Sequence, residues 1–133
     1  MQTKIRLKKS WLYVDVQTGL VVQRMDEGTY MEAQDSFDCF EECFKLKGRE
    51  PIYFLSDMRG VKGMSKEARK VTAADAKEAK FYAVAALINS GISKILGNFV
   101  IRLNKHEHPV RMFTKEEEAI AWLKKQRLEN GHA

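Results

Sequence analysis

Apolar and polar positions alternate in short blocks along the chain, which predicts β-strands separated by helices. Residues 11–16 and 20–25 are two such blocks, and Gln17-Thr18-Gly19 lies between them. This arrangement predicts an antiparallel β-hairpin at the edge of a sheet. Residues 4–8 alternate apolar with basic side chains, and they either extend the first strand or form another edge strand.

Three later apolar runs predict the rest of the sheet. They cover residues 51–55, 81–88 and 110–113, and each is followed by a polar or glycine break and then by helical periodicity. Such strand–helix units are typical of a buried, partly parallel sheet. Residues 81–88 are apolar at both alternating sets of positions, so we expect the central parallel strand there.

Helical periodicity predicts about four helices. The first covers residues 29–48, with Thr29 as N-cap, Glu32 completing a capping box and Gly48 at the end. Its predicted core stripe is Tyr30, Ala33, Phe37, Phe40 and Phe44, bordered by Cys43 and with Cys39 near the far side. The others cover residues 65–79 (in one piece from Ser65, or in two with a start at Thr72), 91–104, and 114–123 with Thr114 as N-cap.

Composition indicates an ordinary globular protein. The 133 residues are 44% hydrophobic and 31% charged, so we expect a single domain over residues 1–133. The N-terminus lacks the apolar region of a secretory signal, and no apolar run approaches the ~20 residues of a membrane span. Cys39 and Cys43, four residues apart, fit a reducing compartment. We therefore expect a cytoplasmic protein without a transmembrane segment.

The net charge of +5 is unevenly distributed. Residues 26–42 carry seven acidic side chains and no basic one, whereas basic residues gather in 1–10, 62–80 and 124–127. Such surfaces either attract an anionic partner or simply keep the protein soluble. Because the chain has no nucleic-acid recognition motif, we expect no nucleic-acid binding.

Catalytic and metal-binding motifs are missing from the sequence. There is no nucleophile elbow, glycine-rich phosphate loop or His-Glu-x-x-His pattern, and residues 60–63 (GVKG) indicate a turn. Cys39, Cys43, His106 and His108 are metal-ligand types, but their spacing does not predict a zinc site. We expect no enzyme activity, no cofactor and no metal.

Several segments resemble SpoIIAA-like proteins of the STAS-like superfamily. Residues 110–123 (VRMFTKEEEAIAWL) resemble the strand–helix ending of that group, and residues 54–60 (FLSDMRG) resemble its strand and Asp-x-Arg turn. The glycine-turn hairpin also fits, so the resemblance covers roughly residues 11–125. It implies an α/β fold with a mixed β-sheet, an N-terminal β-hairpin and about four α-helices, in a mostly non-enzymatic domain that binds partner proteins.

Some members of the group are phosphorylated at the start of the helix that follows the central strand, and others have been proposed to bind lipids or nucleotides. The comparable position here is near Ser65. The Asp-Ser-x-Gly context of the phosphorylated members is absent, and Met64-Ser65-Lys66-Glu67 stands in its place. Ser65 is therefore either a plain helix N-cap or a phosphorylation site.

Two groups of residues are candidates for a binding surface. Asp57 and Arg59 follow a buried strand at the edge where α/β sheets bind ligands, and they either contact a ligand or partner, or pair with each other. The second group is Ile95, Phe99 and Leu103, on the apolar face of the helix predicted at 91–104, which is either core or a contact surface.

These features predict a non-enzymatic regulatory module that acts through a protein partner or a homodimer. Its contact surface would combine Asp57, Arg59 and Ser65 with the helix at 91–104. The alternative is a carrier of a small lipid-like or anionic ligand in an apolar pocket between helix and sheet. An internal cavity beneath Phe99 and Leu103 would favour the carrier, whereas a flat apolar surface patch would favour the interaction module.

Overall fold

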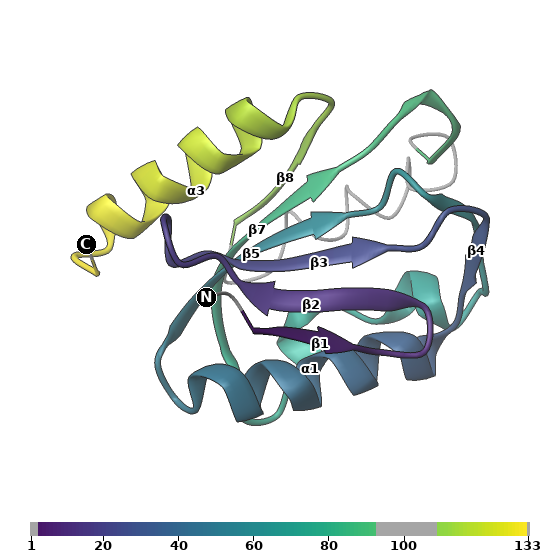
Figure 1. Cartoon of the computed structure of the whole chain (residues 1–133), viewed down its shortest axis with the longest axis horizontal. Helices are drawn as coiled ribbons and strands as arrows, with labels where there is room; N and C mark the ends of the chain where they lie inside the picture. Colours follow the sequence, from purple (N-terminus) through teal and green to yellow (C-terminus); the bar gives the residue numbers. More distant parts are fainter. Residues whose placement is uncertain (1–2, 93–108, 133) are drawn as a thin grey trace.

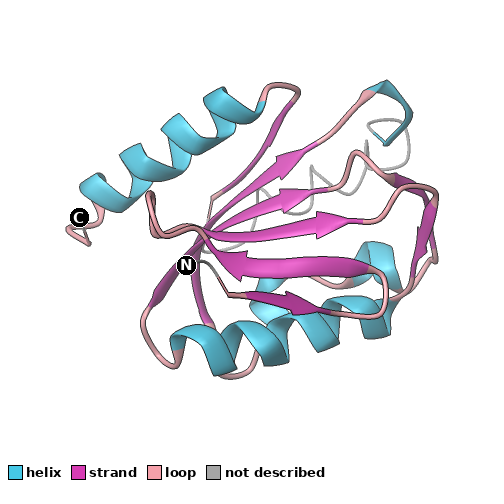
Figure 2. Ribbon diagram, viewed as in Figure 1, coloured by secondary structure: helices cyan, strands magenta, loops and turns pink. Residues whose placement is uncertain are grey.

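A computed structural model describes residues 3–92 and 109–132, and it shows a mixed β-sheet between two layers of helix (Figures 1 and 2). The sheet order is β1-β2-β3-β5-β7-β8. Its strands are β1 (Lys4–Arg6), β2 (Ser10–Val14), β3 (Val21–Met25), β5 (Pro51–Asp57), β7 (Lys80–Leu87) and β8 (Val110–Phe113). A small second sheet pairs β4 (Thr29–Met31) with β6 (Val61–Met64). The two α-helices that lie wholly within the described residues are α1 (Ala33–Lys47) and α3 (Glu116–Glu129).

The predicted hairpin and the parallel strands are confirmed. β2 and β3 pair antiparallel, and the turn between them contains Gly19 at a φ of 76°, a conformation that glycine adopts without strain. β1 adds antiparallel to β2 as a separate edge strand, which is one of the two arrangements expected. β3, β5, β7 and β8 pair in parallel, and β7 lies between β5 and β8 as the predicted inner strand.

Strand alternation divides the core between the two faces of the sheet. Tyr53 and Leu55 of β5 belong to a core cluster with Ala119 and Leu123 of α3. Ile52 and Phe54 point to the other face, where they join a cluster that includes residues of α1. Figure 1 shows α1 and α3 on opposite sides of the sheet, so the arrangement has three layers.

α1 starts later than predicted, because residues 29–31 form β4 and pair in parallel with β6. The N-cap is Glu32, which forms a capping box with Asp35, so Thr29 as N-cap was wrong. β6 also occupies part of the GVKG segment that was expected to be only a turn. Gly60 allows the approach, since a Cβ there would lie 2.6 Å from the Asp26 carbonyl oxygen.

The predicted core stripe of α1 was partly wrong. The buried residues of the helix are Ser36, Cys39 and Cys43, whereas Phe37 is 42% exposed. Phe40 and Phe44 are partly buried at the margin of the core. The large phenylalanines dominated the sequence pattern, but the face of α1 that turns to the sheet carries the smaller Ser36, Cys39 and Cys43.

No α-helix forms over residues 65–79, which was predicted to be helical. Two 3₁₀ turns stand there, η1 (Ala68–Lys70) and η2 (Ala73–Asp75). The segment has no row of large apolar residues to bury, and a short helix without a packed face is marginal in water. Thr72 does act as a cap, since its Oγ1 accepts a hydrogen bond from the Ala74 N–H in η2.

α3 matches the prediction closely. Its N-cap is Lys115 instead of Thr114, and Ala119 and Leu123 are buried as expected. The helix predicted at 91–104 falls mostly outside the described residues, as do Ile95, Phe99 and Leu103. Over the two described ranges, no helix is long and apolar enough to cross a membrane.

Candidate functional site

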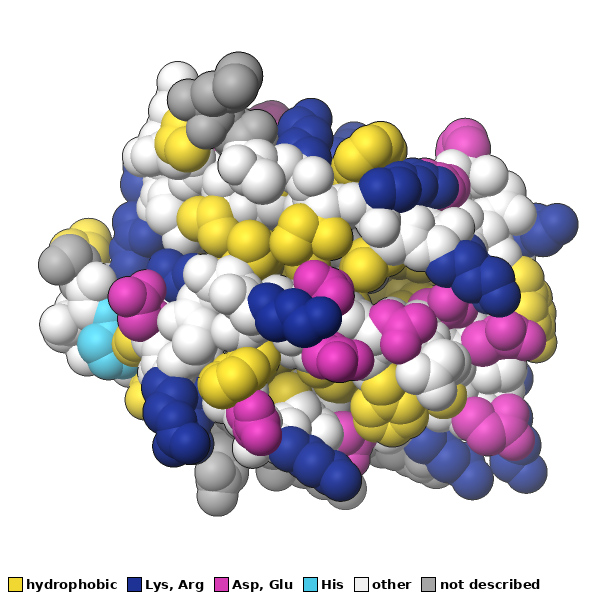
Figure 3. Space-filling model, turned by 60° about the horizontal axis from the view of Figure 1, so that its bottom comes forward, with side chains coloured by type: hydrophobic (Ala, Val, Ile, Leu, Met, Phe, Trp, Pro, Cys, Tyr) yellow, Lys and Arg dark blue, Asp and Glu magenta, His cyan; other side chains and the backbone are white. Residues whose placement is uncertain are grey.

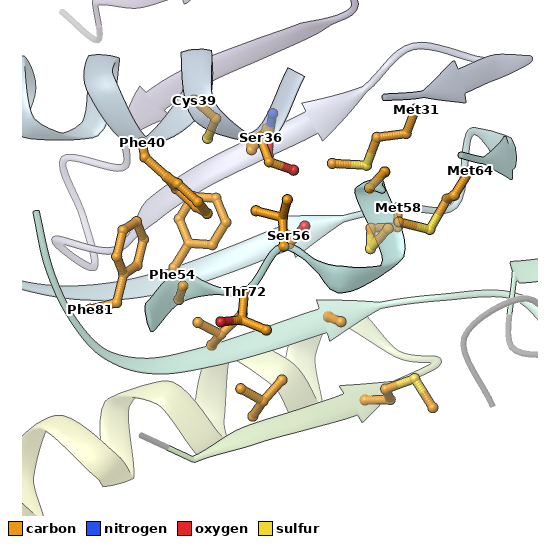
Figure 4. Close-up of a pocket in the computed structure, with 18 residues that line it drawn as sticks. Met31, Ser36, Cys39, Phe40, Phe54, Ser56, Met58, Met64, Thr72 and Phe81 are labelled. Atoms are coloured by element: carbon orange, nitrogen blue, oxygen red, sulfur yellow. The ribbon is translucent and has the colours of Figure 1, made fainter. Parts of the chain in front are cut away.

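A cavity of about 110 Å³ lies between α1 and the sheet (Figure 4). Most of its described lining residues are buried, and the cavity is partly open to solvent. The described lining comes from α1, six strands, the residue that follows β5, and the segment that contains η1 and η2. The residues are Gln23, Met31, Ser36, Cys39, Phe40, Phe54, Ser56, Met58, Met64, Ala68, Val71, Thr72, Ala73, Phe81, Val84, Ala86, Val110 and Met112.

Two rows of side chains across the sheet form the floor of this cavity. Strand register aligns Phe54 with Val84 and Val110 in one row. It aligns Gln23 with Ser56, Ala86 and Met112 in the next. Side chains two residues apart on a strand point to the same face, so both rows face α1.

The two ends of the cavity differ in chemistry. Phenylalanines gather at one end, where the ring of Phe81 contacts those of Phe40 and Phe54 at centroid distances of 5.5 and 5.3 Å. Figure 4 shows Met31, Met58 and Met64 together at the other end. None of the described lining residues carries a charge, so this part of the cavity surface is mainly apolar and electrically neutral.

Three polar side chains interrupt this apolar lining. Gln23 is 3% exposed, and its Nε2 donates to Ser10 Oγ at 3.1 Å. Within residues 3–92 and 109–132, the Gln23 carbonyl oxygen and the hydroxyls of Ser36 and Ser56 have no hydrogen-bond partner. Buried polar groups usually have partners, so this corner of the cavity suits a molecule that forms hydrogen bonds.

A charged cluster lies on the opposite face, at the carboxyl ends of β3 and β5. Arg24 Nη1 donates to Asp57 Oδ2 at 2.8 Å and to Glu116 Oε1 at 2.7 Å, and Arg24 Nε donates to the Tyr13 hydroxyl at 2.9 Å. Arg59 donates to both carboxylate oxygens of Asp57, each at 2.9 Å. The cluster therefore connects the hairpin, β5 and the start of α3.

Electrostatics keep this cluster charged. Burial raises the pKa of Asp57, but hydrogen bonds from Arg59 and Arg24 outweigh that effect, so the pKa lies below its usual value. The hydrogen bond to Glu116 raises the pKa of Arg24. Both oxygens of Asp57 are occupied, and the Arg59 side chain, 46% exposed, is the part of the cluster most open to solvent.

The structure brings only some of the predicted site residues together. Asp57 and Arg59 pair with each other, as one of the two interpretations expected. Ser65 is bonded elsewhere, because its N–H donates to the Met31 carbonyl oxygen and its Oγ accepts from the Ala68 N–H at 3.0 Å. The N-cap of η1 is Glu67, and the Ser65 hydroxyl holds the first N–H of this turn from two residues before the N-cap. Phosphorylation of Ser65 stays a prediction.

Sequence reasoning missed the polar residues of the cavity and two members of the charged cluster, Arg24 and Glu116. A signal for the cavity was present, because Gln23 and Ser56 occupy strand positions whose neighbours two residues away are apolar. Ser36 stands three residues before buried Cys39 on the same helix. Long-range partners such as Arg24 and Glu116, 92 residues apart, have no local signature.

The two cysteines are free and buried, with their sulfurs 4.0 Å apart. The hydrogen bond with Cys43 and burial both raise the pKa of Cys39, which keeps its thiol protonated and a poor nucleophile. In the part of the chain that the structure describes, no three His, Cys, Asp or Glu side chains are placed to share a metal ion.

Comparisons with known proteins agree with this fold. No curated protein matches the sequence. The chain is similar to the crystal structure of an uncharacterized protein of the DUF3478 family with a SpoIIAA-like fold, from Shewanella loihica PV-4. The identity is 13%, the TM-score is 0.52, and the match covers 92% of each chain. This confirms the SpoIIAA-like fold predicted from the sequence.

The family itself comes from a separate match. Residues 14–127 match the family model described as a domain of unknown function, DUF7793, from the hairpin to the end of α3. The chain therefore belongs to the DUF7793 family, a domain of unknown function, and has a SpoIIAA-like fold.

Proposed function

We propose that this protein is a non-enzymatic binding protein that holds a small, mainly apolar molecule between α1 and the sheet. The observation that carries the proposal is the largely buried cavity of about 110 Å³, whose described lining residues are uncharged. Engineered apolar cavities of about 150 Å³ bind benzene. The cavity therefore suits a small ring or the end of a longer apolar chain.

The lining favours a neutral ligand over the anionic one considered from the sequence. An anion buried without a positive partner loses its hydration, and no Lys, Arg or His is among the lining residues of the described ranges 3–92 and 109–132. Four methionines, Met31, Met58, Met64 and Met112, contribute to the lining. Their flexible side chains adapt to the shape of a guest, which supports binding of a molecule slightly larger than the empty space.

Non-enzymatic action is supported by the lack of an activated group at the cavity. Among the described residues the lining contains no carboxylate or histidine, and Cys39, which contributes a thiol there, has a raised pKa. The two free cysteines also support the proposed cytoplasmic location, where thiols stay reduced.

The experiment is native mass spectrometry of the protein purified gently from its own cells. Ala86→Leu adds three carbons to the cavity floor, and Ala121→Leu makes the same change at an exposed position of α3. We expect a small-molecule mass on the wild type and on Ala121→Leu, and none on Ala86→Leu. The same bound mass on all three proteins would contradict binding in the cavity, and no bound mass on the wild type would contradict the proposal.

A regulatory module that acts through protein contacts is the second candidate. It is favoured by an apolar groove of about 680 Å³ on the surface between α1 and residues 75–79, lined by Phe37, Phe40 and Phe44 among other residues. In Figure 3, which brings the α1 side forward, hydrophobic side chains lie in separate groups among charged ones. Phe40 lines both the groove and the cavity, so a guest in the cavity would affect this surface.

Sedimentation analysis tests the homodimer form of this second candidate. Phe37→Ser removes an exposed apolar ring from the groove, and Leu128→Ser removes an exposed apolar side chain from α3 as the matched control. We expect the wild type and Leu128→Ser to dimerise and Phe37→Ser to remain monomeric. A wild type that is monomeric at every concentration contradicts the homodimer.

A further inference from the structure

Three polar side chains meet on one side of the apolar cavity. Gln23 and Ser56 are direct neighbours across the parallel pair of β3 and β5. Ser36 comes from α1, and Figure 4 shows it facing Ser56 across the cavity. The two elements that enclose the cavity therefore both direct polar groups into it.

Gln23 and Ser36 are buried, Ser56 is partly buried, and all three have unused hydrogen-bonding capacity. Ser36 is 8% exposed and Gln23 is 3% exposed. Each hydroxyl can donate one hydrogen bond, and the Gln23 carbonyl oxygen can accept one. Since none of the three is used by a described residue, the corner offers two donors and at least one acceptor to whatever occupies the cavity.

We propose that the cavity selects a neutral molecule with one hydrogen-bonding group, such as an alcohol, a phenol or an amide, on an apolar body. This inference rests on the proposed function and names the ligand class of the same cavity. The polar group of the ligand lies between Ser36, Ser56 and Gln23, while its apolar body extends along Phe54 and Ala86. A molecule without a polar group leaves the three side chains unsatisfied, and an ion finds no opposite charge.

The probes are toluene, phenol and benzoate, each titrated at pH 7 into the full-length protein. Toluene and phenol have the same shape and differ by a methyl or a hydroxyl group. Binding is followed by the NMR signals of the methionine methyl groups. Met31, Met58, Met64 and Met112 line the cavity, so their methyl signals report on a probe bound there.

In a purely apolar cavity toluene binds more tightly than phenol, because phenol loses hydrogen bonds to water. Here we expect phenol to bind at least as tightly as toluene, and benzoate not to bind. Ser36→Ala should weaken phenol binding about tenfold relative to toluene, which corresponds to about 1.4 kcal/mol. Ser65→Ala removes a hydroxyl that does not line the cavity, so the ratio of the two affinities should stay unchanged.

The outcomes separate failure of the polar selection from failure of the proposed function. If toluene binds more tightly than phenol and Ser36→Ala leaves the ratio unchanged, the polar selection is wrong while the apolar cavity stands. Benzoate binding as tight as that of phenol would overturn the preference for a neutral ligand. If no probe shifts the methionine signals of the cavity, water alone occupies it, and the proposed function fails together with this inference.

Discussion

Ser36→Ala tests whether the hydroxyl on the buried face of α1 lacks a partner in the ligand-free protein. An unsatisfied buried hydroxyl costs about 1–3 kcal/mol, and its removal recovers that cost. Alanine is also the better helix former, by up to about 0.5 kcal/mol at an interior position. Because a cavity of about 110 Å³ has room for water, which offsets part of the cost, we take the lower end. The expected gain is about 1–1.5 kcal/mol in the free energy of unfolding.

Urea unfolding followed by tryptophan fluorescence measures this gain, since Trp11 and Trp122 both lie outside α1. A higher midpoint with an unchanged slope indicates a true stability change. Ser36→Thr keeps the hydroxyl and serves as the control, and we expect no increase in its free energy of unfolding. If Ser36→Ala lowers the free energy of unfolding by more than about 0.5 kcal/mol, the hydroxyl makes a stabilising hydrogen bond and the predicted lack of a partner is wrong.

Three further predictions concern residues outside the cavity lining. Asp57→Asn should cost about 2 kcal/mol in urea unfolding, since it removes a paired, buried carboxylate. The wild type should lose this stability as the pH falls below 3.8 toward the lowered pKa of Asp57, whereas Asp57→Asn should show no such loss. Asp26→Asn, which changes an exposed ion pair, should alter the stability little. Equal acid sensitivity of the wild type and Asp57→Asn would contradict this prediction. Ser65→Ala should cost about 1 kcal/mol through the lost hydrogen bond from the Ala68 N–H, and an unchanged melting temperature would argue against this hydrogen bond. Gly60→Ala should cost about 2–3 kcal/mol, because its Cβ would meet the Asp26 carbonyl oxygen at 2.6 Å, and a wild-type urea midpoint would disprove the clash.

Local patterns predicted the strands well because each strand carries its own signal. Residues 81–88 are apolar at both sets of alternating positions, and β7 is indeed an inner parallel strand. The hairpin was also predictable, because alternation on both sides of Gly19 leaves few other arrangements. The family resemblance then indicated the SpoIIAA-like fold, which periodicity alone does not identify.

Tertiary context decided the positions where the prediction failed. Thr29 and Glu32 form a plausible capping box, yet pairing with β6 makes Thr29–Met31 a strand. Residues 65–79 have helix-forming composition, but they have no apolar face to bury and form two short turns.

The cavity is a further example of an effect beyond local sequence. Its polar corner joins β3, β5 and α1, and sequence spacing alone does not specify that Gln23, Ser36 and Ser56 meet. A polar residue at a position that the periodicity assigns to the core is the available signal.

The most direct test of ligand binding between α1 and the sheet is a crystal structure of the protein as purified from its own cells. We expect electron density for a small molecule there, with its apolar part against Phe54 and Ala86 and a polar atom within hydrogen-bond distance of Ser36 or Ser56. A cavity filled only by ordered water, or closed by the surrounding side chains, would contradict it.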